Sequence, residues 1–182
     1  MHARLALLLC VAGLACTGAV AVAAGAGHPQ RAAAGKARIP ALPARDEVVV
    51  GRCPIPSKFR AAFVRAAKDT GFQLSMLIAV AQVESRFVPT AHSSADARGL
   101  LQVMPATAES LSLDVNTPST NVLAGARYLK ILLNRYSRTD LALAAYNAGP
   151  TAVDKAGGAP WPETQTYIAN VQQRWASLAG CS

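Results

Sequence analysis

The sequence predicts a mainly helical protein with little or no sheet, on three observations. The chain of 182 residues is 52% hydrophobic and rich in Ala and Leu, but aromatic residues make up only 5%. Ala and Leu favour helix, whereas strands are enriched in aromatic and β-branched residues. Apolar residues recur at helical spacing in segments bounded by Gly or Pro, and no two segments form a convincing strand pair. We expect one folded domain, residues 53–182, with about seven helices.

Residues 1–24 have the features of a secretory signal peptide. Arg4 gives a positive start, residues 5–11 are apolar, and Ala21, Val22 and Ala23 match a small-x-small cleavage pattern. The alternatives are a retained membrane anchor and, through Cys16, a lipoprotein. Residues 25–52 are rich in Ala, Gly, Pro and Arg and read as a flexible linker, in which residues 46–50 could add a short strand. We expect export with cleavage of the signal.

Export changes how the cysteines are interpreted. Cys10 and Cys16 would leave with the signal, and Cys53 and Cys181 would remain at the two ends of the domain. Disulfides persist in oxidising compartments, so we expect a bridge between Cys53 and Cys181, the alternative being two free thiols.

The first half of the domain contains three predicted helices. Ser57 is a plausible N-cap for a helix over residues 57–70, which Gly71 would end. A second helix starts near residue 73 and ends before Pro89, since the residue preceding a proline is disfavoured in helix. Residues 89–98 form a loop, and a short helix spans about residues 105–111 after it, with Pro105 at its start.

The second half contains four more predicted helices. Thr120 or Asn121 is expected to cap a helix that runs to about residue 136. Asp140 is expected to cap the next helix, residues 141–147, which Gly149 ends. A short helix from residue 151 and a loop over residues 157–162 lead to an amphipathic helix over residues 163–178.

Glu84 stands out at the end of the second predicted helix, in the segment AVAQVES. Residues three and four apart share a helix face, so Glu84 lies beside Val80, Ala81 and Phe87, on the apolar side. Burial raises the pKa of a carboxyl, and a carboxyl protonated near neutral pH is a candidate general acid. The alternative is a solvated carboxylate, or one paired with Arg86.

Several other chemistries find no support in the sequence. His92 is the only histidine in the domain, no spacing matches a metal site, and neither a GxSxG elbow nor a glycine-rich phosphate loop is present. The formal net charge of +8 is scattered rather than gathered in a stripe with aromatics, which argues against nucleic acid. A diffuse positive charge suits an anionic polymer or a membrane surface. We expect no metal, no cofactor and no nucleic-acid partner.

Four motifs together resemble the family 1 lytic transglycosylases of the soluble-lytic-transglycosylase type. They are Glu84 with Ser85, the segment GLLQVMP at residues 99–105, the segment AAYNAGP at residues 144–150, and Tyr167. They stand in the family's order and spacing, and the likeness covers most of residues 57–175. The segment 93–99 departs mildly from the family's Ser-Pro-x-Gly-Ala stretch.

The resemblance implies a lysozyme-like helical fold with a catalytic cleft, a periplasmic location and peptidoglycan as substrate. Glu84 would act as acid and then base on the β-1,4 bond between N-acetylmuramic acid and N-acetylglucosamine, closing a 1,6-anhydro ring without water. Ser85 would bond the sugar or the carboxyl, and Tyr167 would help hold Glu84 and the substrate. The remaining cleft residues would be Gln102, Met104, Tyr146 and Asn147.

Two rival functions remain open on the sequence. The first is a lysozyme-type hydrolase, which would need a positioned water and a second carboxylate. The second is a non-catalytic peptidoglycan-binding assembly protein. The chain's size and signal also resemble small members of the family that accompany secretion, pilus or conjugation machines.

Overall fold

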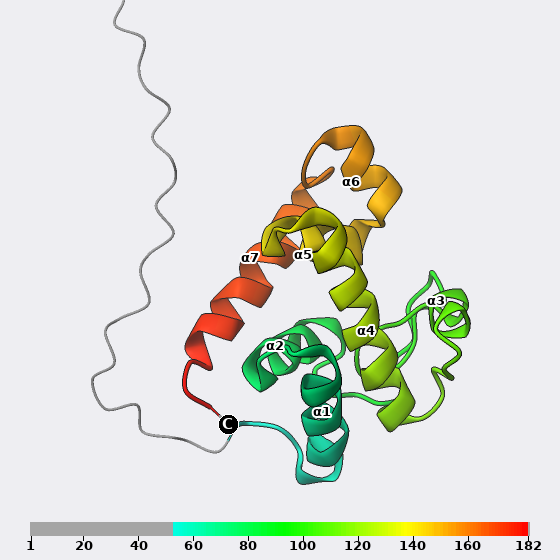
Figure 1. Cartoon of the computed structure of the whole chain (residues 1–182), viewed down its shortest axis with the longest axis vertical. Coiled ribbons are helices and arrows are strands. Elements are labelled where there is room, and N and C mark those ends of the chain that lie inside the picture. The colour runs from blue at the N-terminus through cyan, green and yellow to red at the C-terminus, as the bar shows by residue number, and fades with distance from the viewer. Residues whose placement is uncertain (1–52, 182) are drawn as a thin grey trace, which may run out of the picture. The chain divides into compact units, whose positions relative to one another are not determined.

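In a computed structural model of the chain, residues 53–181 are described, and their regular structure is helical (Figure 1). In chain order the helices are α1 (Ser57–Thr70), α2 (Leu74–Glu84), α3 (Pro105–Ser110), α4 (Pro118–Tyr136), α5 (Thr139–Ala148), α6 (Pro150–Ala156) and α7 (Pro162–Ser177). The only β-type pairing in this part of the chain is two isolated bridges, from Arg98 to His92 and to Val103. The predicted mainly helical class is confirmed, whereas the predicted signal, linker and short strand lie outside the described residues.

Helix α2 runs through the core. Every residue from Ser75 to Ala81 is buried, and α2 packs against α1 and α7. A helix that is buried on all sides must be apolar all round, which the run MLIAVA satisfies. Ser75, the polar residue before this run, is also buried, at 5% exposed. The carboxyl of Glu84 is therefore carried at the end of the most buried helix of the domain.

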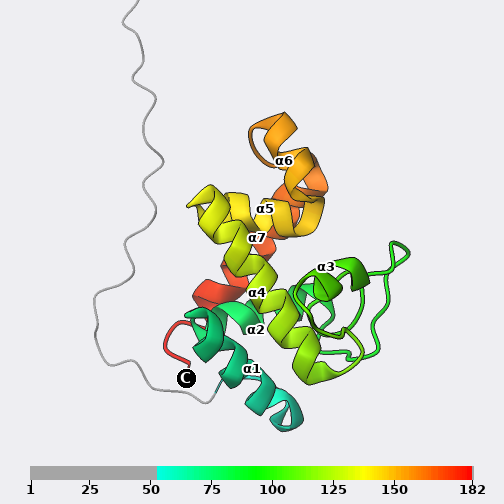
Figure 2. The same cartoon turned by 45° about the vertical axis from the view of Figure 1, so that its right-hand side comes forward.

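Helix α4 joins the two halves of the domain. It packs against α1, α3 and α5, and α5 in turn packs against α6 and α7. Figures 1 and 2 show α6 at the end opposite the C-terminus and α3 beside α4. The long loop of residues 85–104 leads into α3. This arrangement brings the C-terminal end of α2, the loop and the helices α5 and α7 into one region.

The start of α4 differs from the prediction. The helix begins at Pro118, and its N-cap is Thr117, whose side chain accepts a hydrogen bond from the backbone N–H of Thr120. A proline suits the first helical position because its φ is already helical and it has no N–H to satisfy. Asn121, which we considered as a cap, is therefore inside the helix, and its side chain does not cap the helix end.

Two other predicted caps are also wrong. Pro56 occupies the N-cap of α1, so Ser57 is the first helical residue. Asp140 lies in the first turn of α5 and pairs with Arg138, which itself stands at the N-cap. The acidic side chain still favours this helix end, because it lies near the positive pole of the helix dipole.

A disulfide joins the two ends of the described chain. Cys53 and Cys181 are bridged with their Cα atoms 4.7 Å apart, and Figure 1 shows the C-terminal end beside the segment that precedes α1. The bridge spans 128 residues of sequence, so it encloses all seven helices.

Candidate active site

Helix α2 ends abruptly at Glu84. We expected the helix to continue until just before Pro89, but Arg86 and Phe87 adopt positive φ angles of 52° and 62°. This left-handed backbone is uncommon for residues other than glycine and is maintained only where packing enforces it. Phe87 supplies such packing, since its ring meets Phe63 of α1 edge-on with centroids 6.0 Å apart. The turn frees the Glu84 side chain from any further helical neighbours.

Burial dominates the electrostatics of Glu84. It raises the pKa of this carboxyl from 4.5 to about 7, and a hydrogen bond from Tyr167 opposes the rise only in part. The Tyr167 hydroxyl donates to Oε1 of Glu84 over 2.6 Å. No other carboxyl and no cation contributes to the shift, so the alternative of a carboxylate paired with Arg86 does not account for the Glu84 pKa. At neutral pH, Glu84 is thus near its midpoint and can both give and take a proton.

Tyr167 reaches Glu84 from the last helix. It lies on α7, which packs along α2, and it is only 7% exposed. Burial and the nearby Glu84 carboxylate raise the Tyr167 pKa well above 10, so the hydroxyl remains a hydrogen-bond donor at any pH of interest. The structure therefore brings together Glu84 and Tyr167, the two predicted cleft residues that are farthest apart in sequence.

Ser85 and Gln102 fasten the loop beside Glu84. The buried Ser85 hydroxyl donates to the Leu100 carbonyl at 2.8 Å, rather than to the Glu84 carboxyl. The Gln102 amide donates to the carbonyls of Ala91 and Gly99 at 3.1 and 3.0 Å, which leaves its Oε1 for a ligand. Both side chains thus hold the glycine motif in place against the end of α2.

Asn121 is a site residue that sequence reasoning missed. It is 1% exposed on α4; its Oδ1 accepts from the Leu101 N–H at 2.9 Å, and its Nδ2 donates to the Arg98 carbonyl at 2.7 Å. Gly99 lies so close that a Cβ there would meet Nδ2 at 2.5 Å. The signal that could have found it is a polar Asn among buried apolar residues of a helix, since a buried amide requires partners.

Gly125 is a second missed residue, one turn further along α4. A Cβ at this position would lie 2.7 Å from the Leu101 side chain and 2.8 Å from the Tyr146 hydroxyl. That hydroxyl donates to the Leu101 carbonyl at 2.7 Å. A glycine inside a helix costs about 1 kcal/mol relative to Ala, so its presence here already pointed to a close approach.

Tyr146 lies close enough to Glu84 for the two groups to interact. Burial, and next the Glu84 charge, raise the Tyr146 pKa well above 10. The ring of Tyr146 also packs against Tyr128 of α4, with centroids 5.6 Å apart. Leu101, Tyr146 and Glu84 therefore belong to one cluster built from the loop, α5 and α2.

The other two predicted residues are exposed. Asn147 lies near the end of α5, and its Oδ1 accepts a hydrogen bond from Thr164 at 3.0 Å. Thr164, in the first turn of α7, is 1% exposed and was not singled out from the sequence. Met104 is the N-cap of α3 and is 40% exposed, so its thioether is open to a ligand.

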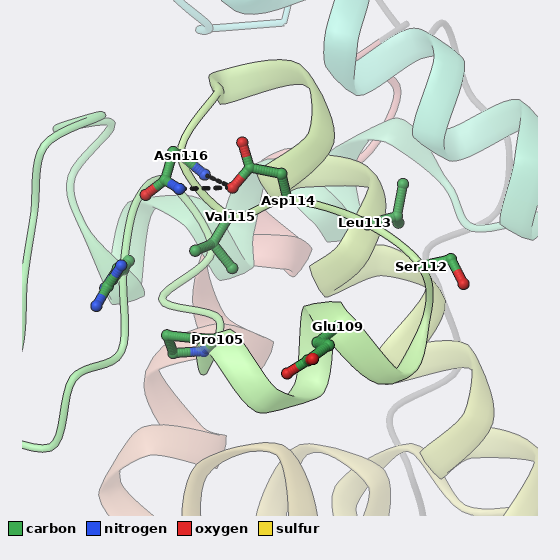
Figure 3. A pocket seen from close by; sticks show the side chains of 8 residues that line it. Pro105, Glu109, Ser112, Leu113, Asp114, Val115 and Asn116 are labelled. Carbon is green, nitrogen blue, oxygen red and sulfur yellow. Dashed lines mark hydrogen bonds between the residues drawn. The ribbon is translucent and has the colours of Figure 1, made fainter.

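Two open pockets flank these segments, and Glu84 lines neither of them. One, of about 490 Å³, lies beside α3, where Asp114 accepts hydrogen bonds from Asn116 (Figure 3). The other, of about 580 Å³, lies between α6 and the start of α7, directly after the Tyr146–Asn147 pair. Its lining is Ala148, Gly149, Pro150, Thr151, Ala152, Lys155, Ala156, Pro160 and Trp161.

Residues 53–181 offer no group of three or more His, Cys, Asp or Glu side chains that could hold a metal ion. His92 is bonded to Asp96, which also pairs with Arg98 on the exposed loop. No helix in the described part of the chain has the length and hydropathy to cross a membrane.

Sequence comparisons match this chain to a transglycosylase family model and to transglycosylase relatives. Residues 61–167 match the family model described as the transglycosylase SLT domain, and these residues include every predicted site residue except the two cysteines. The putative soluble lytic murein transglycosylase of Haemophilus influenzae is 30% identical over 142 residues, which is 64% of this chain and 24% of that protein. The transglycosylase of Enterobacteria phage PRD1 is 40% identical over 109 residues, covering 59% of this chain and 39% of that protein.

Solved structures agree with the sequence matches. An inactive mutant of the lytic transglycosylase Slt from Pseudomonas aeruginosa superposes with a TM-score of 0.57 at 29% identity, over 68% of this chain and 25% of that one. The 70 kDa soluble lytic transglycosylase from Escherichia coli gives 0.58 at 26% identity, over 67% and 24%. The lysozyme-like helical fold expected from the sequence is therefore confirmed, although the chain spans only about a quarter of the length of these relatives. Because the family model matches more than half of the chain, this protein belongs to the family that contains the transglycosylase SLT domain.

Proposed function

We propose that the protein is a peptidoglycan lytic transglycosylase that cleaves the β-1,4 bond between N-acetylmuramic acid and N-acetylglucosamine. The observation that carries the proposal is the Glu84 carboxyl, which is partly buried at the end of α2, has a pKa of about 7 and is hydrogen-bonded to Tyr167. Membership of the SLT family and the names of the relatives support the same substrate class.

Glu84 would act twice in the reaction. Tyr167 occupies its Oε1, so Oε2, which has no hydrogen bond to residues 53–181, is the oxygen that would deliver the proton to the glycosidic oxygen. The C1–O4 bond breaks, N-acetylglucosamine leaves with the proton, and the acetamido group of the muramoyl residue stabilises the cationic carbon. Glu84 then takes the proton of the 6-hydroxyl while O6 bonds to C1. A 1,6-anhydro ring forms, and no water is consumed.

Glu84 would have to ionise while it gives up its proton, and Tyr167 would assist that step. A hydrogen bond to the charged form of a carboxyl stabilises the charge that develops in the transition state. We place Gln102, Met104, Tyr146 and Asn147 along the substrate path, with the Gln102 Oε1 and the exposed Asn147 and Met104 available to the sugars.

The rival hydrolase is less well supported. Hydrolysis on such a fold would use a second carboxylate some 5–9.5 Å from the acid. No second carboxyl contributes to the Glu84 pKa, and Asp96 is held by His92 and Arg98. A single acid/base that works with the substrate's own groups fits this setting.

Product analysis tests the proposal. Purified peptidoglycan treated with the protein should release muropeptides with 1,6-anhydromuramic ends, identified by mass spectrometry. Reducing muramic ends would instead identify a hydrolase, and binding without release would identify an assembly protein. Glu84→Gln should abolish release, whereas Glu163→Gln, which removes an exposed carboxyl in the first turn of α7, should not.

An inhibitor offers an independent check. A solved structure similar to this chain, at 27% identity and a TM-score of 0.58, is the complex of the 70 kDa soluble lytic transglycosylase with bulgecin A. We propose that bulgecin A binds this chain as well and that it competes with glycan. Loss of that binding in a Glu84→Gln variant that still folds would place the ligand at the acid.

We also propose that the protein is exported and acts in the periplasm, with residues 1–24 as its signal. Cell fractionation followed by N-terminal sequencing of the mature protein would test this, since a start near residue 25 indicates cleavage and a lipid on Cys16 indicates a lipoprotein. Association with a secretion, pilus or conjugation apparatus is a further proposal, and co-purification from crosslinked envelopes would test it.

A further inference from the structure

The pocket between α6 and the start of α7 has the composition of a ligand site that lies apart from Glu84. We propose that it binds a second muropeptide unit of the glycan strand, with a pyranose ring against Trp161 and a stem-peptide carboxylate on Lys155. The inference rests on the proposed function, because it takes peptidoglycan as the ligand.

The pocket shares both of its walls with the candidate active site. One wall, from Ala148 to Pro150, continues the helix that carries Tyr146 and Asn147. The other wall contains Trp161, the N-cap of α7, and Tyr167 follows only five residues after the first residue of that helix, a rise of about 7.5 Å. The hydrogen bond from Thr164 to Asn147 clamps the two walls together. A strand that runs from Glu84 past the C-terminal end of α5 and the start of α7 would therefore meet this pocket next.

Trp161 is a preorganised aromatic platform. It is 50% exposed, which is a large apolar surface to leave in water. Pro160 and Pro162 flank it, and prolines restrict both their own φ and the backbone of the residue before them. The electron-rich face of an indole attracts the weakly positive C–H groups on one face of a sugar ring. A fixed platform binds such a ring with little loss of conformational entropy.

Lys155 supplies an unpaired positive charge on the same pocket. It lies in the last turn of α6 and is exposed, and within residues 53–181 no carboxylate forms an ion pair with it. The neighbouring Asp154 is engaged with Arg135 and Tyr136 on the other side. An ammonium group beside a sugar platform matches a muropeptide, whose stem peptide carries carboxylates, better than it matches a neutral polysaccharide.

Binding measurements on a catalytically dead protein separate this inference from the proposed function. In the Glu84→Gln background, the dissociation constant is measured for purified glycan chains, for the same chains stripped of stem peptides by an amidase, and for a single disaccharide unit. Trp161→Ala should weaken binding of both long glycans about 3–10-fold. Lys155→Gln should weaken binding of the peptide-bearing chains alone, by about 2–5-fold, and Lys155→Arg should restore it. The disaccharide, which is too short to reach both places, should bind all variants alike.

Matched controls remove similar groups elsewhere. Ile131→Ala deletes an apolar side chain of α4 that is 49% exposed, and Lys68→Gln neutralises an exposed lysine in the last turn of α1. The inference is overturned if Trp161→Ala binds long chains as tightly as Ile131→Ala does, or if the Lys155→Gln defect persists on stripped glycan. Failure of the wild-type protein to release anhydro products would overturn the proposed function instead, whatever the binding pattern.

Discussion

Removing the hydroxyl of Tyr167 should move the pH dependence of cleavage upward. The hydroxyl donates a 2.6 Å hydrogen bond to Glu84 and lowers its pKa against the effect of burial. A hydrogen bond to a charged group contributes about 1.5–3 kcal/mol, which at about 1.4 kcal/mol per unit corresponds to one to two pKa units. In Tyr167→Phe the ring still fills its buried position, so burial of Glu84 remains and its pKa should rise by about that amount.

The assay is the pH profile of kcat/KM for release of soluble muropeptide, which reports the ionisation of the free enzyme. The proton donor must be protonated, so activity of the wild type should fall as pH increases through about 7. In Tyr167→Phe this fall should occur about one to two pH units higher. The maximal rate should drop, because the carboxylate formed in the reaction has lost its donor. An alkaline limb that stays in place while the rate drops would show that Tyr167 acts on the substrate alone, and would refute the reasoning.

Three further predictions concern stability and packing. The Glu84 pKa rises on folding from 4.5 to about 7, so ionisation of this carboxyl destabilises the folded state. Relative to Glu84→Gln, the wild type should lose up to about 3 kcal/mol of unfolding free energy between pH 4.5 and pH 7 in urea denaturation. A difference between the two proteins that stays constant with pH would contradict the pKa shift. Gly125→Ala should cost about 1–3 kcal/mol and most of the activity, because its Cβ displaces the site loop and a tyrosine hydroxyl, whereas Gly158→Ala, with open space around it, should be silent in both assays. Replacing Cys53 and Cys181 by Ser should lower the unfolding free energy by up to about 4–5 kcal/mol, as expected for a closed loop of 128 residues; equal stability of reduced and oxidised protein would show that the bridge contributes nothing.

Local sequence patterns predicted the helices and the apolar surroundings of Glu84. All seven helices of the described residues lie within about two residues of the predicted bounds at one end or both, because Gly and Pro mark their limits and apolar spacing marks their faces. The buried setting of Glu84 also follows from local spacing, since its neighbours three and four residues away are apolar. The end of α2 was misplaced because tertiary packing enforces the left-handed turn at Arg86 and Phe87, and no local preference encodes that turn.

The residues that position the loop were missed because their partners lie far away in sequence. Asn121 and Gly125 differ from their neighbours as a polar residue and a glycine inside a helix, but neither pattern names the partner that the residue meets, and the same holds for Thr164. Ser85 and Gln102 were predicted to contact the substrate; in the structure their hydroxyl and amide hold the loop through backbone carbonyls, which a motif does not reveal. Spacing along a chain predicts which residues share a helix face, whereas contacts between distant segments are set by the tertiary structure.

Glu84 accepts a hydrogen bond from Tyr167, 83 positions away, and the burial that raises its pKa depends on the packing of α1 and α7 on α2, so the raised pKa arises only in the folded domain. Closing contacts at such separations is slow compared with forming single helices. In an unfolded or newly synthesised chain, Glu84 has a solvated carboxyl with a pKa of 4.5, so it is ionised at neutral pH and has no proton to donate. Acidity is thus coupled to completion of the tertiary structure, so under the proposed mechanism a chain that has not finished folding cannot protonate a glycosidic bond.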